Sequence, residues 1–518
     1  MAAPATPTEI TGATVGAPAR PIVQRAGLVL VVAGGLGLVG QLLFFDVAAG
    51  VNLPLAFGLL AMGGWLLRSA RRPATIDVWL GPAGVAFAAF AAIRADPFIV
   101  ACDTLVAIGL VGGALASFGG RSVVARPFAG LFSLGFGTAG WVLGGAIPAA
   151  ADAGRSLPSG RTAMRRATPA LPVVRGLLIA LPLLVIFIAL FSSADAVFAR
   201  MLDDLVGWDL NLGDLGWRIA LAAVLAWLAA GGLALAASAA GATDIPAGSA
   251  AAGPRMGTTE LLTVLVILDA LFAAFVVLQA AYLFGGLDTM QAAGLTYAEY
   301  ARRGFFELVV VAILAGAVVI AADRLAATRT TALIGAAIGL AVLTSVVLVS
   351  ATSRLRLYQE AYGWTELRFY VLGTIVVLGI GLVGLVVTLL ADRVRWMGHV
   401  LIVTGLIVGL ALSVIGPVRF ITEQNVARAL DPSLVPPNGS SGLDVVYASS
   451  LGDDAIPELV RALPVLDPAS AEMLAQSLSF RLDELQSDSA LSAWQAWNIG
   501  RESARDALEA ARGAGQIP

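Results

Sequence analysis

Twelve long apolar runs dominate this sequence and limit what it can fold into. At about 1.5 Å of rise per residue, each run is long enough to cross a bilayer as a helix. Of the 518 residues, 58% are hydrophobic and only 13% are charged, too few charges for a soluble fold. We therefore predict an all-α fold, a polytopic membrane helix bundle of about 12 transmembrane helices with a small helical C-terminal domain. The runs lie at 26–45, 47–67, 76–93, 97–118, 127–147, 173–191, 217–240, 259–284, 304–322, 331–351, 369–390 and 399–416.

Composition divides the chain into three parts. Residues 1–25 are rich in Ala, Pro, Thr and Gly and are predicted to be a disordered tail. Residues 26–416 form the predicted transmembrane bundle, and residues 417–518 form an acidic helical C-terminal domain. Three connections mix aromatic residues with opposed charges, which is typical of segments at a membrane interface. These segments lie near 192–215, 285–303 and 351–368.

The last hundred residues differ in charge from the rest. Residues 419–518 hold 7 Arg and 14 Asp and Glu, a net charge of −7, whereas residues 1–418 hold 25 Arg and 21 Asp and Glu. Leu474, Leu478 and Leu482 recur at helical spacing, as do apolar residues before and after them. This spacing predicts about three amphipathic helices that pack on each other or on the bundle. The negative charge argues against their lying flat on an anionic bilayer.

Missing residue types exclude several kinds of chemistry. The chain has no lysine, so a P-loop and Schiff-base chemistry are excluded. His399 and Cys102 are the only residues of their types, too few for a zinc site or an internal disulfide. We expect no cofactor, no metal and no catalytic residue. An enzyme, which would have to use carboxylates, is the third choice for function.

Arginines in the connections predict the orientation. With all twelve runs crossing, sixteen arginines fall on the side of the N-terminus and ten on the other side. Because positive residues are enriched in cytoplasmic loops, both termini are predicted to be cytoplasmic.

Carboxyl groups inside the apolar runs are the main candidate site residues. Asp269 lies near the middle of the eighth run and Asp103 about two turns into the fourth. An ionised carboxylate there costs at least about 2.5 kcal/mol, so we expect a partner, a proton or a water-filled cavity. A structural hydrogen bond to a neighbouring helix is the alternative for both. The predicted substrate or ion site consists of Asp195, Asp269, Arg302, Arg303, Glu307, Glu366 and Arg368, with Asp103 as a further intramembrane carboxylate.

Several stretches also resemble those of a known family: 193–198, 300–308, 362–368, 423–428, 443–444, 450–457 and 494–498, followed by Arg501. Together they resemble a bacterial multi-pass family known only as domain of unknown function 4173. The resemblance implies an inner-membrane location and no assigned activity, and the stretch at 362–368 departs from it at Trp364.

Two functions of different classes follow from these observations. The first is a transporter-like or small-solute/lipid-handling protein, in which arginines pair an anionic small molecule or lipid headgroup and Asp269 binds a proton or cation. The alternative is a non-transporting sensor or scaffold whose C-terminal domain recruits a cytosolic protein. We expect the lipid bilayer as a partner and no nucleic acid.

Overall fold

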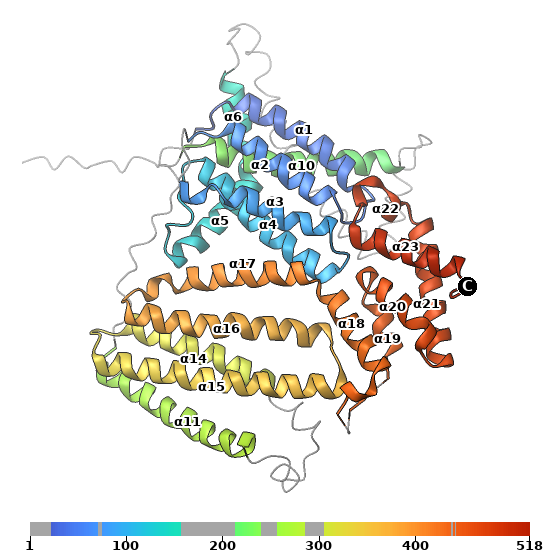
Figure 1. The fold of residues 1–518 in the computed structure, drawn as a ribbon. Helices are drawn as coiled ribbons and strands as arrows, with labels where there is room; N and C mark the ends of the chain where they lie inside the picture. Colours follow the sequence, from blue (N-terminus) through green and yellow to red (C-terminus); the bar gives the residue numbers. More distant parts are fainter. Residues whose placement is uncertain are drawn as a thin grey trace, which may run out of the picture.

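The computed structural model describes residues 22–70, 75–156, 213–239, 256–284, 305–436, 439–440 and 442–518. Within these residues the fold is helical, and the only β pairing consists of two isolated bridges. Helices run side by side in two groups, and the helices of the C-terminal domain cover one end of both (Figure 1).

The first group packs closely because small residues lie where its helices cross. A Cβ added to Gly84 of α3 would lie 2.7 Å from Val111 of α4, and one on Gly40 of α1 would lie 2.7 Å from Leu225 of α10. Such spacing is typical of membrane helices. The helices are α1 (Ala26–Phe44), α2 (Asn52–Leu67), α3 (Leu80–Ala89), α4 (Pro97–Phe118), α5 (Phe128–Gly144), α6 (Ala146–Ser156) and α10 (Gly213–Ala237).

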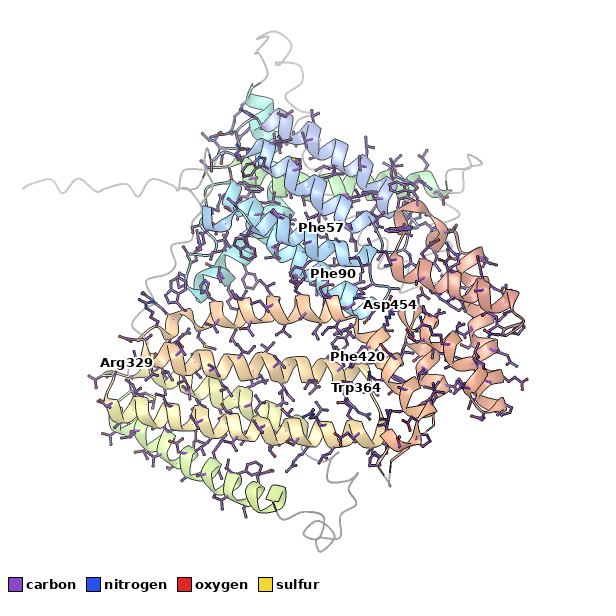
Figure 2. The ribbon with its side chains drawn as sticks, in the orientation of Figure 1. Phe57, Phe90, Arg329, Trp364, Phe420 and Asp454 are labelled. Atoms are coloured by element: carbon purple, nitrogen blue, oxygen red, sulfur yellow. The ribbon has the colours of Figure 1, made fainter. Side chains whose placement is uncertain are left out.

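The second group forms a row in which α17 lies nearest to the first group and α11 lies farthest from it (Figure 1). At the end away from the C-terminal domain, the guanidinium of Arg329 joins helices of this row (Figure 2). It pairs with Asp323, 3.0 Å away, and with Asp392, and donates to the Leu389 carbonyl at 3.0 Å. The helices are α11 (Thr258–Phe284), α14 (Phe305–Leu325), α15 (Thr331–Tyr362), α16 (Glu366–Leu390) and α17 (Met397–Ile415).

The C-terminal domain has an apolar core of its own. On α21, Leu474, Leu478, Leu482 and Leu485 are all buried, as their helical spacing predicts. The core also includes residues of the second group: Trp364 packs edge-on against Phe420 of α18, with ring centroids 5.0 Å apart (Figure 2). The α-helices are α18 (Pro417–Leu430), α19 (Val445–Ser450), α20 (Ile456–Ala462), α21 (Pro468–Ser487), α22 (Ser489–Ser492) and α23 (Ile499–Gly513).

Eleven of the twelve predicted runs coincide with described helices, and the run at 173–191 lies outside the described residues. Within the described part, eight helices are long and apolar enough to cross a membrane, or nine if the bent pair α5–α6 counts as one span. The all-α polytopic fold is thus confirmed, while the number twelve stays a prediction. The expected interfacial segment at 351–368 differs: α15 continues unbroken to Tyr362 and is 32 residues long.

The two ends of the described chain lie at opposite ends of the bundle. At the start of α1, Val23 forms a bridge with Ser238 just after α10, whereas the C-terminal domain covers the end where α1 finishes (Figure 1). Residue 22 and the C-terminal domain are therefore separated by the length of the long helices. The prediction that both termini are cytoplasmic stays a prediction.

Candidate functional site

A cavity of about 470 Å³ lies at the junction of the two helix groups, between α4, α16 and α17. Its walls are mostly aliphatic and aromatic, with one carboxyl group, one thiol and two hydroxyl-bearing side chains among them. The lining residues are Phe87, Phe98, Ile99, Cys102, Asp103, Val106, Tyr370, Gly373, Thr374, Val377, Ile402, Gly405, Leu406, Val408, Gly409 and Leu412.

Two glycines leave room for this cavity. Gly405 and Gly409 are four residues apart and therefore lie on one face of α17. A Cβ added to either would meet no atom within 4 Å. Gly373 on α16 instead allows α16 and α17 to pack closely, because a Cβ there would lie 3.2 Å from Leu412. One glycine lets the helices approach, and the other two keep space open between them.

Asp103 places a carboxyl group in the wall of the cavity. The residue is only 3% exposed, and its position on α4 is roughly 10 Å from the start of the helix. Its Oδ1 accepts a hydrogen bond of 2.8 Å from Ser413 on α17. Its Oδ2 is buried and has no hydrogen-bond partner among the described residues. A single hydrogen bond across the two helix groups thus leaves half of the carboxyl unsatisfied.

Asp96, seven residues earlier on the same helix, is fully satisfied. It is the N-cap of α4, and its Oδ1 accepts from the backbone N–H groups of Phe98 and Ile99 at 2.8 and 3.3 Å. Its Oδ2 accepts from the Tyr370 hydroxyl at 2.9 Å, which joins α4 to α16. This side chain therefore fixes the junction where the cavity ends.

Arg94 joins the same junction to the end of α17. Its Nε donates to the Ser413 carbonyl at 2.8 Å, and Nη2 donates to the Val414 carbonyl. These carbonyls belong to the last turn of α17, where the helix dipole favours a cation. The guanidinium also occupies the space where a side chain at Gly416 would lie.

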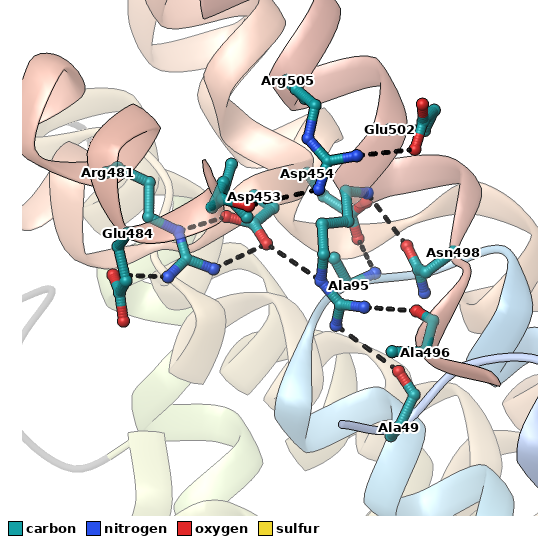
Figure 3. A network of polar contacts seen from close by, with 12 residues as sticks. Ala49, Ala95, Asp453, Asp454, Arg481, Glu484, Ala496, Asn498, Glu502 and Arg505 are labelled. Atoms are coloured by element: carbon teal, nitrogen blue, oxygen red, sulfur yellow. Dashed lines mark hydrogen bonds and ion pairs between the residues drawn. The ribbon is translucent and has the colours of Figure 1, made fainter. Parts of the chain in front are cut away.

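The C-terminal domain completes the junction with Asp454 (Figures 2 and 3). This carboxyl accepts the backbone N–H groups of Ala95 at 2.9 Å and Asp96 at 3.2 Å. Nearby, Asn498 donates to the carbonyls of Ala91 and Arg94 at 2.6 Å each. Burial raises the pKa of Asp454 despite these donors and the nearby Arg94. The C-terminal domain therefore binds the backbone of the loop that leads into α4.

Asp453, the residue before Asp454, lies between two arginines (Figure 3). Arg481 binds it with two parallel bonds, Nε to Oδ1 at 2.7 Å and Nη2 to Oδ2 at 2.8 Å. Arg501 approaches its Oδ2 at 3.8 Å and donates to the carbonyls of Ala496 and Ala49. Hydrogen bonds to Asp453 raise the pKa of Arg481, whereas burial lowers that of Arg501. We call Asp96, Asp453, Asp454, Asn498 and Arg501, with their partners, the clamp.

The residues predicted as a site do not meet at one place. Asp269 lies half-buried on α11, where its carboxyl packs beside Gly339 of α15, and its buried Oδ1 has no hydrogen-bond partner among the described residues. Glu307 is exposed in the first turn of α14. Since α11 is on the far side of the second group, Asp269 does not reach the cavity (Figure 1). Asp195, Arg302 and Arg303 lie outside the described residues.

Glu366 and Arg368 lie where α15 turns into α16. The Arg368 guanidinium donates to the Gly363 carbonyl at 2.5 Å and stacks over Tyr358, 4.1 Å from the ring centroid. Glu366 lies in the first turn of α16, four residues before Tyr370, and its backbone N–H donates to the Tyr447 hydroxyl at 2.9 Å. Among the predicted residues, Asp103 is therefore in the cavity, Glu366 is near its end, and Arg368 acts as a helix cap.

Sequence reasoning missed the partners Asp96, Tyr370 and Ser413. Asp96 carries a readable signal, because an Asp-Pro pair before an apolar run predicts an N-cap. Ser413 and Tyr370 carry none, since their contacts join residues about 300 positions apart in the chain. In the described part, no three His, Cys, Asp or Glu side chains are grouped in a way that could hold a metal ion.

Comparisons with known proteins assign no activity to this chain. No curated protein and no solved structure matches the chain. A family of unknown function matches over residues 82–462, which contain the cavity and both Asp453 and Asp454. Its number is not the one that the sequence resemblance indicated. The chain belongs to the family described as domain of unknown function (DUF4153).

Proposed function

We propose that this membrane protein takes a small molecule into the cavity between its two helix groups, and that Asp103 is the proton-binding group of this site. The proposal is transporter-like, because the cavity lies between two groups of helices, and transporter sites commonly lie at the interface between two such units. One observation carries it: a buried carboxyl with a free oxygen lies in the wall of a cavity inside the membrane domain.

The hydrogen bonds around Asp103 suit a protonated acid. Ser413 Oγ lies 2.8 Å from Asp103 Oδ1 and 3.0 Å from the Gly409 carbonyl, but a hydroxyl has only one hydrogen to donate. If Asp103 is protonated, it donates to Ser413, and Ser413 donates to Gly409. If Asp103 is ionised, Oδ2 is a buried charge without a partner, which is expensive in a low-dielectric interior. Proton uptake and release at Asp103 would therefore change the packing of α4 against α17.

The lining favours an apolar ligand with a hydrogen-bond donor. Asp103 and Thr374 offer oxygen atoms, and no arginine is among the lining residues in the described part of the chain. The anionic ligand expected from the sequence depends on Arg302 and Arg303, outside the described residues, and Arg368, which caps α15. That expectation stays a prediction, and this cavity does not favour it.

Cys102 provides the test, because the single cysteine of the chain lines the cavity. A charged, membrane-impermeant thiol reagent is added to vesicles containing the full chain, from the outside or from the inside. We expect reaction with Cys102 from both sides, because a transporter exposes its site to each in turn. Gly409→Leu should slow the reaction by filling the cavity. Cys102→Ser, which has no thiol, is the control for labelling at other groups. A thiol that reacts only after unfolding would indicate a closed bundle and favour the scaffold.

The scaffold alternative depends on a C-terminal domain that is free to recruit a partner. Here the domain shares a core with Phe369 on α16 and binds the loop before α4. This arrangement favours a structural role in joining the helix groups. A pull-down with residues 417–518 tests the alternative: specific capture of a cytosolic protein would support recruitment.

A further inference from the structure

One strip of the C-terminal domain differs from the rest of it. Residues 489–500 contain no charged side chain, whereas the domain around them is rich in Asp, Glu and Arg. The strip includes α22, the short turn Trp494–Ala496 and the start of α23. Trp494 is 64% exposed, Trp497 48% and Ile499 49%. Three large apolar side chains within six residues are thus left uncovered by the described part of the chain.

The backbone of this strip is fixed to the connection between α1 and α2. The Val51 N–H donates to the Trp497 carbonyl at 3.0 Å, and the Ala48 N–H donates to the Ala490 carbonyl at 3.0 Å. The Gln495 side chain donates to the Leu42 carbonyl at 3.0 Å. These two backbone carbonyls and the Gln495 amide therefore face the bundle, and the two indole rings remain exposed on the outside.

The strip lies at the level where α1 ends. With 19 residues, α1 is roughly 28 Å long, close to the ~30 Å hydrocarbon core of a bilayer. Leu42 is in its last turn, so a residue bonded to Leu42 lies at the depth of the lipid headgroups. Leu38 and Leu42 are 64% and 59% exposed, as expected of lipid-facing side chains. The strip thus lies beside the last turn of α1.

We propose that residues 489–500 bind the bilayer interface, with Trp494 and Trp497 inserted among the lipid headgroups. Tryptophan prefers this zone because it has an apolar ring and a polar N–H. The negative charge elsewhere in the domain opposes contact with anionic lipid, so only the uncharged strip reaches the membrane. The C-terminal domain is thereby oriented with its edge in the interface. This inference is independent of the proposed function.

Quenching of a fluorescent label tests the proposal in the full-length protein. In a Cys102→Ser background, Ile499→Cys is labelled with bimane and the protein is placed in lipid nanodiscs. Phe480→Cys is the matched control, because Phe480 is a 73% exposed apolar residue on α21 in the same domain. The quenchers are a lipid with a nitroxide near its headgroup and aqueous iodide. Ser492→Cys is a second label position that leaves both tryptophans and Ile499 in place.

We expect the nitroxide lipid to quench the labels at 499 and 492 at least about twofold more than the label at 480, with the reverse order for iodide. Replacing both tryptophans by serine should lower the lipid quenching at 492 toward that at 480. Iodide quenching at 499 and 492 as strong as at 480 would overturn the proposal. Shielding of these labels from both quenchers would also overturn it, because another protein or a second copy would then cover the strip.

Discussion

Two aspartates on one face of α4 show how differently the two ends of this junction are built. Asp96 accepts three hydrogen bonds and belongs to the clamp, where the C-terminal domain adds further bonds to the same loop. Asp103, two turns deeper, accepts one bond and has an unpaired oxygen. Both residues are at most 3% exposed, so burial does not explain the difference.

The contrast indicates that Asp96 and Asp103 have different roles on the same helix. A saturated carboxylate stabilises one geometry, because every lost bond leaves a buried donor unpaired. A half-satisfied carboxyl with space beside it can change its protonation state or its partner at lower cost. We therefore assign the clamp to structure and the cavity to function, and the following predictions test that assignment.

Removal of the clamp should have the largest effect. Truncation after Arg419 removes Asp454 and Asn498 and uncovers the apolar surface around Phe369. We expect that the truncated chain cannot be extracted as a monodisperse species. Size-exclusion chromatography of a fluorescent fusion measures this. A symmetric peak like that of the full chain would show that the bundle does not need the C-terminal domain.

Substitution of Asp96 should have the next largest effect. Asp96→Ala leaves the N–H groups of Phe98 and Ile99 and the Tyr370 hydroxyl without their acceptor. We expect a loss of about 2–4 kcal/mol in the free energy of unfolding, seen as a lower Tm in detergent. Tyr370→Phe is the matched control and should cost about 1 kcal/mol, since it removes one of the three bonds.

Substitution of Asp103 should change stability little. Asp103→Asn keeps a group that can donate to or accept from Ser413 and removes the titrating proton, so we expect a change of no more than about 1 kcal/mol. An apolar carbodiimide, which adds to protonated carboxyl groups, should label Asp103 and spare Asp96, as read by peptide mass spectrometry. Labelling of Asp96 alone, or a large loss of stability in Asp103→Asn, would reverse the roles assigned to the two residues.

The smallest effect concerns the pH dependence of the clamp. Burial raises the pKa of Asp454, so the folded protein holds this proton more tightly than the unfolded chain. The stabilisation from this group is complete below the unfolded pKa of about 4 and is lost as the pH rises through the folded pKa. Asp454→Asn keeps an acceptor for Ala95 and Asp96 but cannot titrate. Its Tm relative to wild type should therefore increase with pH over this range, whereas a constant difference would contradict the prediction.

The sequence predicts the helices well because apolar runs are local. The run predicted at 97–118 has the bounds of α4, and the leucine spacing on α21 predicts its buried face. Helix ends are predicted less well, as the extension of α15 to Tyr362 shows. Nothing in the apolar pattern marks where a polar helix continues beyond a bilayer.

The sequence does not distinguish Asp103 from Asp269. Each is a carboxyl well inside an apolar run, and Asp269 has the longer uninterrupted apolar surroundings. The structure separates them by position, because 44% of the α4 span is buried and only 11% of the α11 span. Which helix becomes central depends on contacts between distant segments, such as Asp103 with Ser413, 310 positions away. Such contacts leave no mark in a local pattern.

The clamp also has a consequence for the order in which the protein is made. The hydrogen bond from Ala95 can form only after Asp454, 359 positions later, has been synthesised. The hydrogen bond to the Leu42 carbonyl can form only after Gln495, 453 positions later, has been synthesised. Because domains assemble as the chain leaves the ribosome, both helix groups are in the membrane before the segment that joins them has been synthesised. The junction around Asp96 is therefore open during most of translation. A chain that stops early exposes unpaired backbone groups there, and quality-control proteases can recognise the incomplete protein by that exposure.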